Sequence, residues 1–114
     1  MVNGLPVTSP QFRVFQGEDW RDGVMFHCAG RALDIEAIGF EVDLYARGAS
    51  TPAATFSTSA GTMLAIGASL QMAVASSVLE ALTPGGYRVL MFGSEDGQRR
   101  LLWDGRLALM QGGN

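Results

Sequence analysis

The sequence predicts an all-β fold, an antiparallel β-sandwich of about seven strands with one short helical turn. Three observations support this fold class. Apolar and polar residues alternate with a period of two along much of the chain. Turn signals recur roughly every 8–12 residues, and only one stretch has a helical pattern. With 114 residues, 47% of them hydrophobic and 17% charged, the chain has enough apolar surface for one core.

The chain divides into an N-terminal arm, residues 1–10, and a β-sandwich domain, residues 11–114. Gly4, Pro6 and Pro10 interrupt the arm. Such an arm is either frayed or docked on a partner.

The clearest strand covers residues 40–46, in which Phe40 and every second residue after it are apolar. Its apolar side is expected to face the core. The same parity continues in the next segment, which predicts that its apolar residues also point inward: Leu64, Ile66, Ala68, Leu70, Met72 and Val74. Gly67-Ala68-Ser69 divides this segment into two strands or marks a bulge. The further strands expected are at residues 12–16, 24–28, 54–58 and 64–74.

One short helical turn is predicted before the best-defined reversal of the chain. Ser77 and Glu80 match a capping box at its start. Pro84-Gly85-Gly86 then reverses the chain, because glycine adopts a positive φ without steric cost. Tyr87 begins the next strand, residues 87–93, at the position of the tyrosine corner of immunoglobulin-like sandwiches. We therefore predict an immunoglobulin-like sandwich in which Gly85, Gly86 and Tyr87 form a structural corner.

The last third of the sequence has the pattern of a long hairpin. The segment Ser94-Glu95-Asp96-Gly97 is a strong signal for the turn of a β-hairpin. The chain is expected to return through residues 99–104 and 106–111, with a bulge at Asp104-Gly105.

Charge and cysteine content exclude several classes of function. The net charge is −3 and no basic face is evident, so no nucleic-acid partner is expected. All eight basic residues are arginines, which excludes lysine-based covalent chemistry. The single Cys28 cannot form an internal disulfide and is compatible with a reducing cytosol. The chain begins without a secretory signal pattern and no segment reaches the ~18 apolar residues of a membrane span, so no membrane partner is expected.

No set of residues matches a catalytic or metal-binding signature. His27 and Cys28 are neighbours on a predicted strand and point to opposite faces, so they cannot form a dyad. The acidic residues Glu18, Asp19 and Asp22 could coordinate a hard cation, but they lack the spacing of a calcium loop. Two pairs of carboxylates are spaced two residues apart, at residues 34 and 36 and at residues 41 and 43. Such pairs are typical of the solvent-exposed face of a strand. We therefore expect a protein that is not an enzyme, with no cofactor and with no catalytic, cofactor-binding or metal-binding residues.

The aromatic residues are the best candidates for contacts with a partner. Trp103 is expected in the core. Trp20 lies in a predicted turn, where an exposed or interface role and a packing role are both open. Because tryptophan, tyrosine and arginine are enriched at interface hot spots, the expected interface residues are Trp20, Arg21, Tyr45 and Arg47.

Four segments in this order resemble a known group of virion proteins. They are "FRVFQGEDWRDGVMF", "ALDIEAIGFEVDLYAR", "SSVLEALTPGGYRVLMF" and "SEDGQRRLLWDGRLALMQG". Their arrangement is similar to small β-sandwich proteins of tailed bacteriophages, in particular the N-terminal attachment domains of baseplate and receptor-binding-fibre proteins. The resemblance spans about residues 12–112 and contains no chemically unique residue.

The resemblance implies a non-enzymatic structural component of a tailed-phage or phage-like particle, made in the host cytoplasm and located in the virion. A tail, baseplate or fibre-attachment adaptor is the first reading. A capsid decoration protein is one alternative, because a longer fibre segment normally follows such attachment domains and this sequence stops at Asn114. A small carbohydrate- or protein-binding module is the other. The implied partners are other virion proteins and further copies of the chain in a symmetric array.

Overall fold

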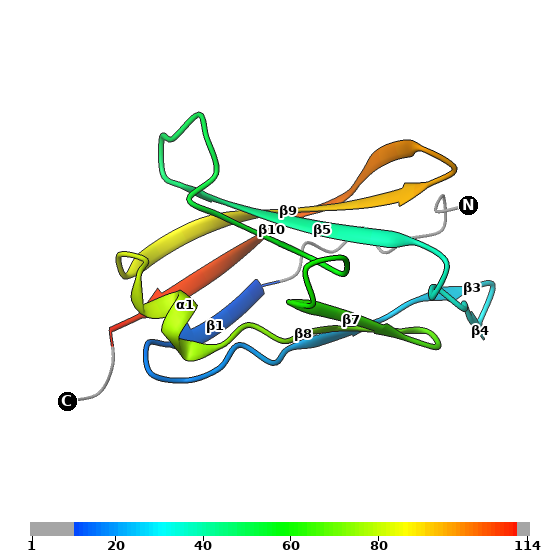
Figure 1. The fold of residues 1–114 in the computed structure, drawn as a ribbon, viewed down its shortest axis with the longest axis horizontal. Coiled ribbons are helices and arrows are strands. Elements are labelled where there is room, and N and C mark those ends of the chain that lie inside the picture. Colours follow the sequence, from blue (N-terminus) through cyan, green and yellow to red (C-terminus); the bar gives the residue numbers. More distant parts are fainter. Residues whose placement is uncertain (1–10, 112–114) are drawn as a thin grey trace.

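The computed structural model describes residues 11–111, which form ten strands and one short helix (Figure 1). The predicted N-terminal arm lies outside the described residues. The elements in chain order are β1 (Gln11–Phe15), β2 (Gly23–Met25), β3 (His27–Cys28), β4 (Arg31–Ala32), β5 (Gly39–Ala46), β6 (Ala54–Ser57), β7 (Met63–Ile66), β8 (Ser69–Met72), α1 (Ser76–Glu80), β9 (Gly85–Glu95) and β10 (Gln98–Met110).

Eight of the ten strands form two packed layers, which confirms the all-β sandwich, and β3 and β4 form a separate two-stranded antiparallel sheet. A five-stranded sheet has the order β1-β10-β9-β5-β6, and a three-stranded sheet has the order β2-β8-β7. Strands β7 and β8 run beneath β5 in Figure 1. The pairings are antiparallel except that of β1 with β10, which is parallel. These two strands come from opposite ends of the chain, so no hairpin fixes their direction.

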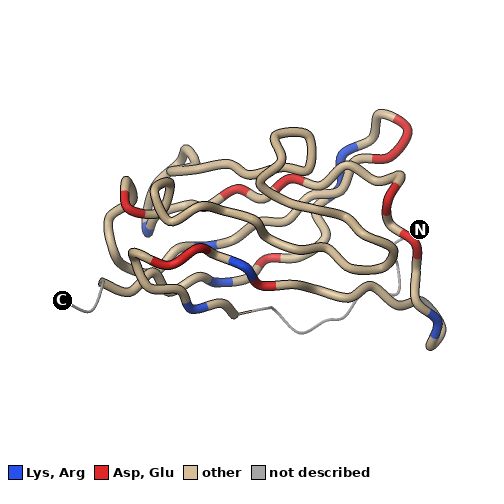
Figure 2. The backbone as a smooth tube through the Cα atoms, turned by 60° about the horizontal axis from the view of Figure 1, so that its bottom comes forward, with Lys and Arg blue, Asp and Glu red and all other residues tan. Residues whose placement is uncertain are grey.

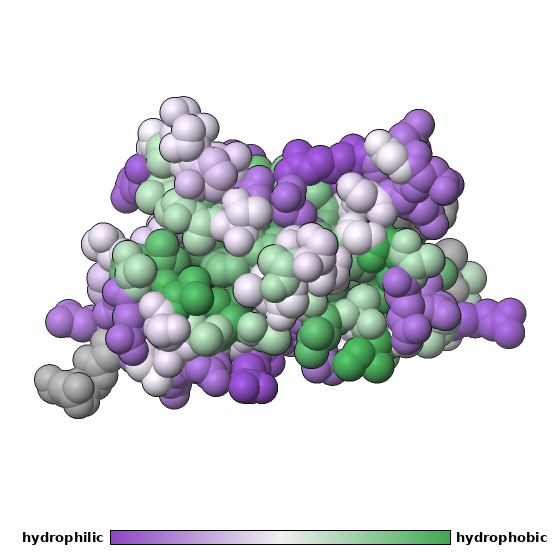
Figure 3. All heavy atoms as spheres, viewed as in Figure 1, coloured by the Kyte–Doolittle hydropathy of each residue, from purple (hydrophilic) through white to green (hydrophobic). Residues whose placement is uncertain are grey.

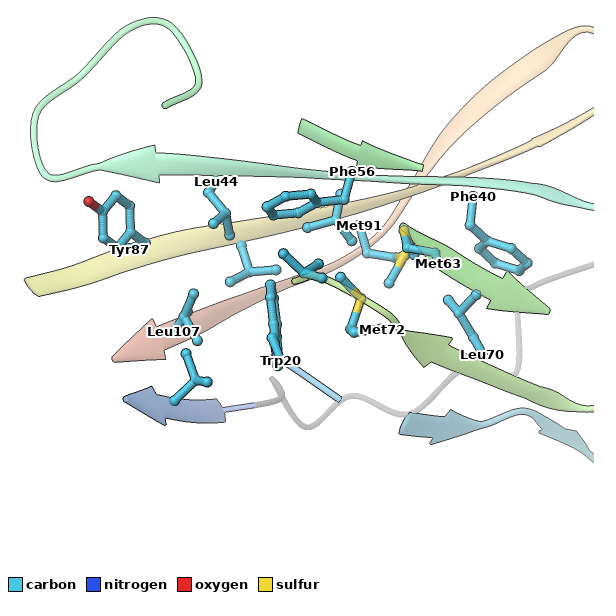
Figure 4. Close-up of a cluster of buried hydrophobic side chains, with 14 of the residues drawn as sticks. Trp20, Phe40, Leu44, Phe56, Met63, Leu70, Met72, Tyr87, Met91 and Leu107 are labelled. Atoms are coloured by element: carbon cyan, nitrogen blue, oxygen red, sulfur yellow. The ribbon is translucent and has the colours of Figure 1, made fainter. Parts of the chain in front are cut away.

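The core lies between the two sheets and contains both tryptophans; Figure 4 shows Trp20 among the buried side chains. Trp20 is 1% exposed and Trp103 is 8% exposed. The rings of Phe12 and Phe56 meet Trp20 edge to face, with centroids 5.5 and 6.0 Å away, a favoured geometry for aromatic pairs. The core position of Trp103 is therefore confirmed.

The alternation predicted for β5 is confirmed, but that predicted for β7 is wrong. Phe40 and the apolar residues at alternate positions after it are buried up to Leu44. In β7, however, Leu64 and Ile66 are 44% and 56% exposed. A two-residue turn pairs Ile66 with Ser69, and directly paired residues point to the same side of a sheet. The inward positions of β7 are therefore the odd-numbered ones, beginning with the fully buried Met63.

The helix α1 is present, but the predicted capping box is wrong. Its N-cap is Ala75, which provides no side-chain cap. Instead, the backbone N–H of Ser76 donates to Oδ1 of Asp19 at 2.9 Å. Asp19, which is distant in sequence, thus accepts a hydrogen bond from one of the free backbone amides in the first turn of α1. With only five residues, α1 is short, and no helix in the described chain is long and apolar enough to cross a membrane.

The tyrosine corner is confirmed by its hydrogen bond. The Tyr87 hydroxyl donates to the carbonyl oxygen of Thr83 at 2.5 Å. Gly85 has a φ of 151°, which side chains rarely allow. The strand begins at this glycine rather than at Tyr87, because Gly85 and Gly86 already pair with β10.

The hairpin of β9 and β10 is also confirmed, with its bulge in a different place. Asp96 and Gly97 have φ values of 55° and 79°, as in the tight turns that connect twisted strands. The register shifts between Leu101 and Trp103, not at Asp104-Gly105. Because Leu102 is the extra residue, both it and Trp103 pack on the core side.

Candidate interaction groove

The outer face of the five-stranded sheet carries a wide hollow. It has a volume of about 980 Å³ and lies where β5, β9 and β10 meet the loop after β5. Its polar lining includes Tyr45, Arg47, Arg88 and Arg106. We call these four residues and the hollow they line the Arg–Tyr groove.

The strand register places three of these side chains in one row. Arg106 of β10 pairs with Arg88 of β9, which pairs with Tyr45 of β5. Neighbouring strands lie about 4.8 Å apart, so the three side chains form a continuous line across the sheet. The next row contains Ala108 and Gly86, and their small size leaves the space that forms the hollow.

The groove carries a net positive charge. Arg88 forms a two-pronged ion pair with Asp104, with its Nη2 2.7 Å from Oδ2 and its Nε 3.1 Å from both carboxylate oxygens. These hydrogen bonds lower the pKa of Asp104 and raise the pKa of Arg88. Arg47 and Arg106 form no ion pair with any residue between 11 and 111. The groove therefore holds three guanidinium groups and has only one carboxylate paired with them, which favours an anionic ligand group.

A second cluster of charges on the same sheet face is internally paired. Arg99 forms ion pairs with Glu41 and Asp43. Its guanidinium carbon lies 3.6 Å from the centroid of the Phe92 ring, a cation–π contact. Thr55 donates a hydrogen bond to Asp43 at 3.2 Å. The carboxylates of Glu41 and Asp43 thus hold strands of the sheet together.

Of the four predicted interface residues, the structure brings only Tyr45 and Arg47 together. The prediction for Trp20 as a contact residue is wrong, because its side chain lies in the core. Its indole N–H donates to Oδ2 of Asp22 at 2.8 Å, and its backbone bridges to Val74. Arg21 is exposed and pairs with Asp19 at 3.2 Å, away from the groove.

Two further groove residues, Arg88 and Arg106, were not among the predicted interface residues. Both lie at outward positions of strands whose alternate residues are buried. Their parity relative to the buried Tyr87 and Leu107 would have placed them on the outer face. Their proximity to Tyr45 depends on long-range strand pairing, which the sequence does not contain. Of the predicted corner, Gly86 and Tyr87 also line the groove.

The acidic cluster near Trp20 has structural contacts. Asp22 accepts the indole hydrogen bond, Asp19 caps α1, and Glu18 accepts a hydrogen bond from the Phe15 amide at 3.4 Å. Among the residues that the structure describes, no three histidine, cysteine, aspartate or glutamate side chains form a potential metal site. His27 is exposed, whereas the Cys28 side chain lies outside the description.

A smaller, apolar pocket opens at the far end of the sandwich, next to the turn between β9 and β10. Its volume is about 290 Å³, and Phe26, Ile35 and Phe40 form its buried floor. Gly93 lines it as well, and a Cβ at this position would lie 3.1 Å from Cδ1 of Leu102. This pocket contains none of the predicted interface residues.

No protein-family model matches the chain, and no curated protein matches its sequence. The surface of the molecule is therefore the basis for inferring its function.

Proposed function

We propose that the protein is a non-enzymatic structural component of a tailed-phage or phage-like particle. Its first candidate role is that of an adaptor at the tail, the baseplate or the point of fibre attachment. The observation that carries this proposal is the Arg–Tyr groove. It presents arginine and tyrosine, two residue types that are enriched at interface hot spots, on a sheet whose strands are hydrogen-bonded to each other. The sequence resemblance to attachment domains points to the same class.

The chemistry of the groove suits binding. Arginine keeps its proton at neutral pH and donates several hydrogen bonds in a fixed plane. Arg47 and Arg106, which form no ion pair within residues 11–111, can bind carboxylates beside Tyr45 and pack against aromatic or apolar groups. We therefore propose that the groove receives an acidic segment of a neighbouring virion protein.

The two alternative roles would use the same surface in different ways. A capsid decoration protein would use the groove on the head rather than on the tail. A carbohydrate-binding module would use Tyr45 as a stacking platform, but the second predicted platform, Trp20, is buried. Of the two, the decoration role fits the observed surface better.

The groove can be tested by charge reversal during particle assembly. Arg47→Glu and Arg106→Glu would be supplied in trans to a phage that lacks the gene, and the protein would be quantified in purified particles by mass spectrometry. We expect both variants to fold and to be depleted from particles, because the acidic segment would then meet like charges. Arg31→Glu is the control, since Arg31 is exposed on β4 and does not line the groove. Normal incorporation of both folded groove variants would contradict the proposed contact.

A further inference from the structure

The smaller pocket at the far end of the sandwich combines an apolar floor with a charged wall. Phe26, Ile35 and Phe40 form its floor and are each at most 3% exposed. The ring centroids of Phe26 and Phe40 lie 5.5 Å apart. The volume of about 290 Å³ is just below the range of about 300–1,000 Å³ that is typical of small-molecule sites, so the pocket suits a ligand of modest size. We call it the end pocket.

Gly93 keeps the end pocket open. Its backbone lies outside the left-handed region, so φ does not require a glycine at this position of β9. A Cβ there would lie 3.1 Å from Cδ1 of Leu102 and 3.5 Å from Cγ2 of Ile38. A side chain at position 93 would therefore occupy space between two lining residues, and glycine leaves this space free.

The register of the last hairpin places an acid and a base on one wall of the end pocket. Arg100 of β10 pairs with Gly93, and Gln98 pairs with Glu95. All four residues line the pocket. Glu95 and Arg100 are therefore diagonal neighbours, which places them roughly 7–8 Å apart. Figure 2 shows the acidic tip of this hairpin in red and the basic residues of the following strand in blue.

These two charges have no ion partner in the part of the chain that the structure describes. Neither Glu95 nor Arg100 forms an ion pair with any residue between 11 and 111. The adjacent Arg99, by contrast, pairs with Glu41 and Asp43. Glu95 and Arg100 are both exposed and therefore accessible to a ligand. Figure 3 shows hydrophilic surface over the hairpin tip and hydrophobic surface below it.

The other charges at this end of the molecule are compatible with one acidic and one basic contact. Asp96 lines the pocket at the turn, so the hairpin tip suits a positive group of a ligand. Arg100, farther from the tip, is the one basic residue in the described lining. Asp34 and Glu36 lie on the loop before β5, and each accepts a hydrogen bond from a backbone amide. Arg31 is exposed on β4 and does not line the pocket.

We propose that the end pocket binds a free amino acid with an aromatic side chain. The ring would lie on the floor beside Phe26 and Phe40, where aromatic rings pack favourably. The ammonium group would contact Glu95, and the carboxylate would contact Arg100 through charge-assisted hydrogen bonds. A ligand with one charge would pair with only one of these two residues. The inference goes beyond the proposed structural role and does not depend on it.

Titration of the purified chain with three related compounds is the first test, followed by two-dimensional NMR of the backbone amides at neutral pH. L-phenylalanine carries both charges, whereas 2-phenylethylamine and 3-phenylpropionate each carry one. We expect L-phenylalanine to bind with a Kd of about 1 mM, with shifts centred on residues 93–102, and each analogue to bind at least about tenfold more weakly. No saturable shift up to about 20 mM L-phenylalanine, or an analogue that binds as tightly, would overturn the proposal.

Removal of single charges tests the two polar contacts. Glu95→Gln and Arg100→Gln should each weaken the binding of L-phenylalanine about tenfold, because each removes one charge-assisted contact. Both side chains are exposed, so the variants should fold. Glu80→Gln and Arg13→Gln are the matched controls, since both residues are exposed and neither lines the pocket. Wild-type affinity in Glu95→Gln or Arg100→Gln would overturn the assignment of that contact.

Gly93→Val tests whether the ligand occupies the space that this glycine leaves. The folded variant should show no saturable shift with L-phenylalanine, because its side chain would reach between Leu102 and Ile38. Urea unfolding shows whether the variant folds, and if it does not, the charge variants decide the test. A folded Gly93→Val chain that binds L-phenylalanine like the wild type would overturn the placement of the ligand in the end pocket.

Discussion

Replacing Tyr87 by phenylalanine is expected to lower the free energy of unfolding by about 1 kcal/mol. The substitution removes only the hydroxyl, which donates to the Thr83 carbonyl at 2.5 Å, while the ring keeps its place at 5% exposure. Thr83 is exposed, so its carbonyl regains a hydrogen bond from water. The cost is therefore that of one ordinary hydrogen bond, without the additional penalty of a buried unsatisfied acceptor.

Urea unfolding of Tyr87→Phe measures this cost. The midpoint should fall with the slope unchanged, because the same surface is exposed on unfolding. Tyr45→Phe is the control: its half-buried ring lies on the outer face, and its stability should change by less than about 0.5 kcal/mol. Equal changes in the two variants would refute the role of the corner hydrogen bond.

The same residue makes stability depend on alkaline pH. Burial raises the pKa of Tyr87 above its ordinary value of 10.0. A raised folded-state pKa gives stability that is fully present below the unfolded pKa and is lost as pH rises through the folded pKa. The wild type should therefore lose more stability than Tyr87→Phe when the pH is raised above about 10.

Two further predictions concern local features of the fold. Hydrogen bonds from the Ser76 amide and Arg21 lower the pKa of Asp19. The Asp19 carboxylate should therefore stabilise the fold above its ordinary pKa of 3.8, and this stabilisation should vanish as the pH falls through the lower folded-state pKa. Asp19→Asn should remove this pH dependence from acid-unfolding curves, and an unchanged curve would contradict the capping of α1 by Asp19. Gly97→Ala should lower the free energy of unfolding in urea by about 1 kcal/mol, because Gly97 has a φ of 79° that alanine adopts only at a steric cost. An unchanged free energy of unfolding would show that the turn relaxes around the new side chain.

Local patterns were sufficient to predict much of the fold. Alternation around Phe40 located β5, and the Asp96-Gly97 pair located the last hairpin. Tyr87 after two glycines predicted the corner because its hydrogen bond spans only four residues. Each of these features depends on residues close together in the chain.

The errors arose where distant segments meet. Trp20 is flanked in sequence by charged and small residues, and its ring is buried in the core where its backbone pairs with the distant Val74. The cap of α1 comes from Asp19, a residue 57 positions before Ser76. A single tight turn between β7 and β8 reversed the expected orientation of Leu64 and Ile66, which are exposed.

The candidate groove was predicted only in part for the same reason. Tyr45 and Arg47 are neighbours on one strand and its loop, so their joint exposure followed from the local pattern. Arg88 and Arg106 join them through the pairing of β5, β9 and β10. Long-range register, rather than residue chemistry, assembled the site.

Gold-labelled antibody imaging of particles from a lysate of the source organism tests the central claim most directly. The proposed adaptor role predicts label at the tail end of the particles and peptides of this chain in the purified particle fraction. Label over the head instead would replace the adaptor role by capsid decoration. Particles without label, and a particle fraction without these peptides, would contradict the structural role itself.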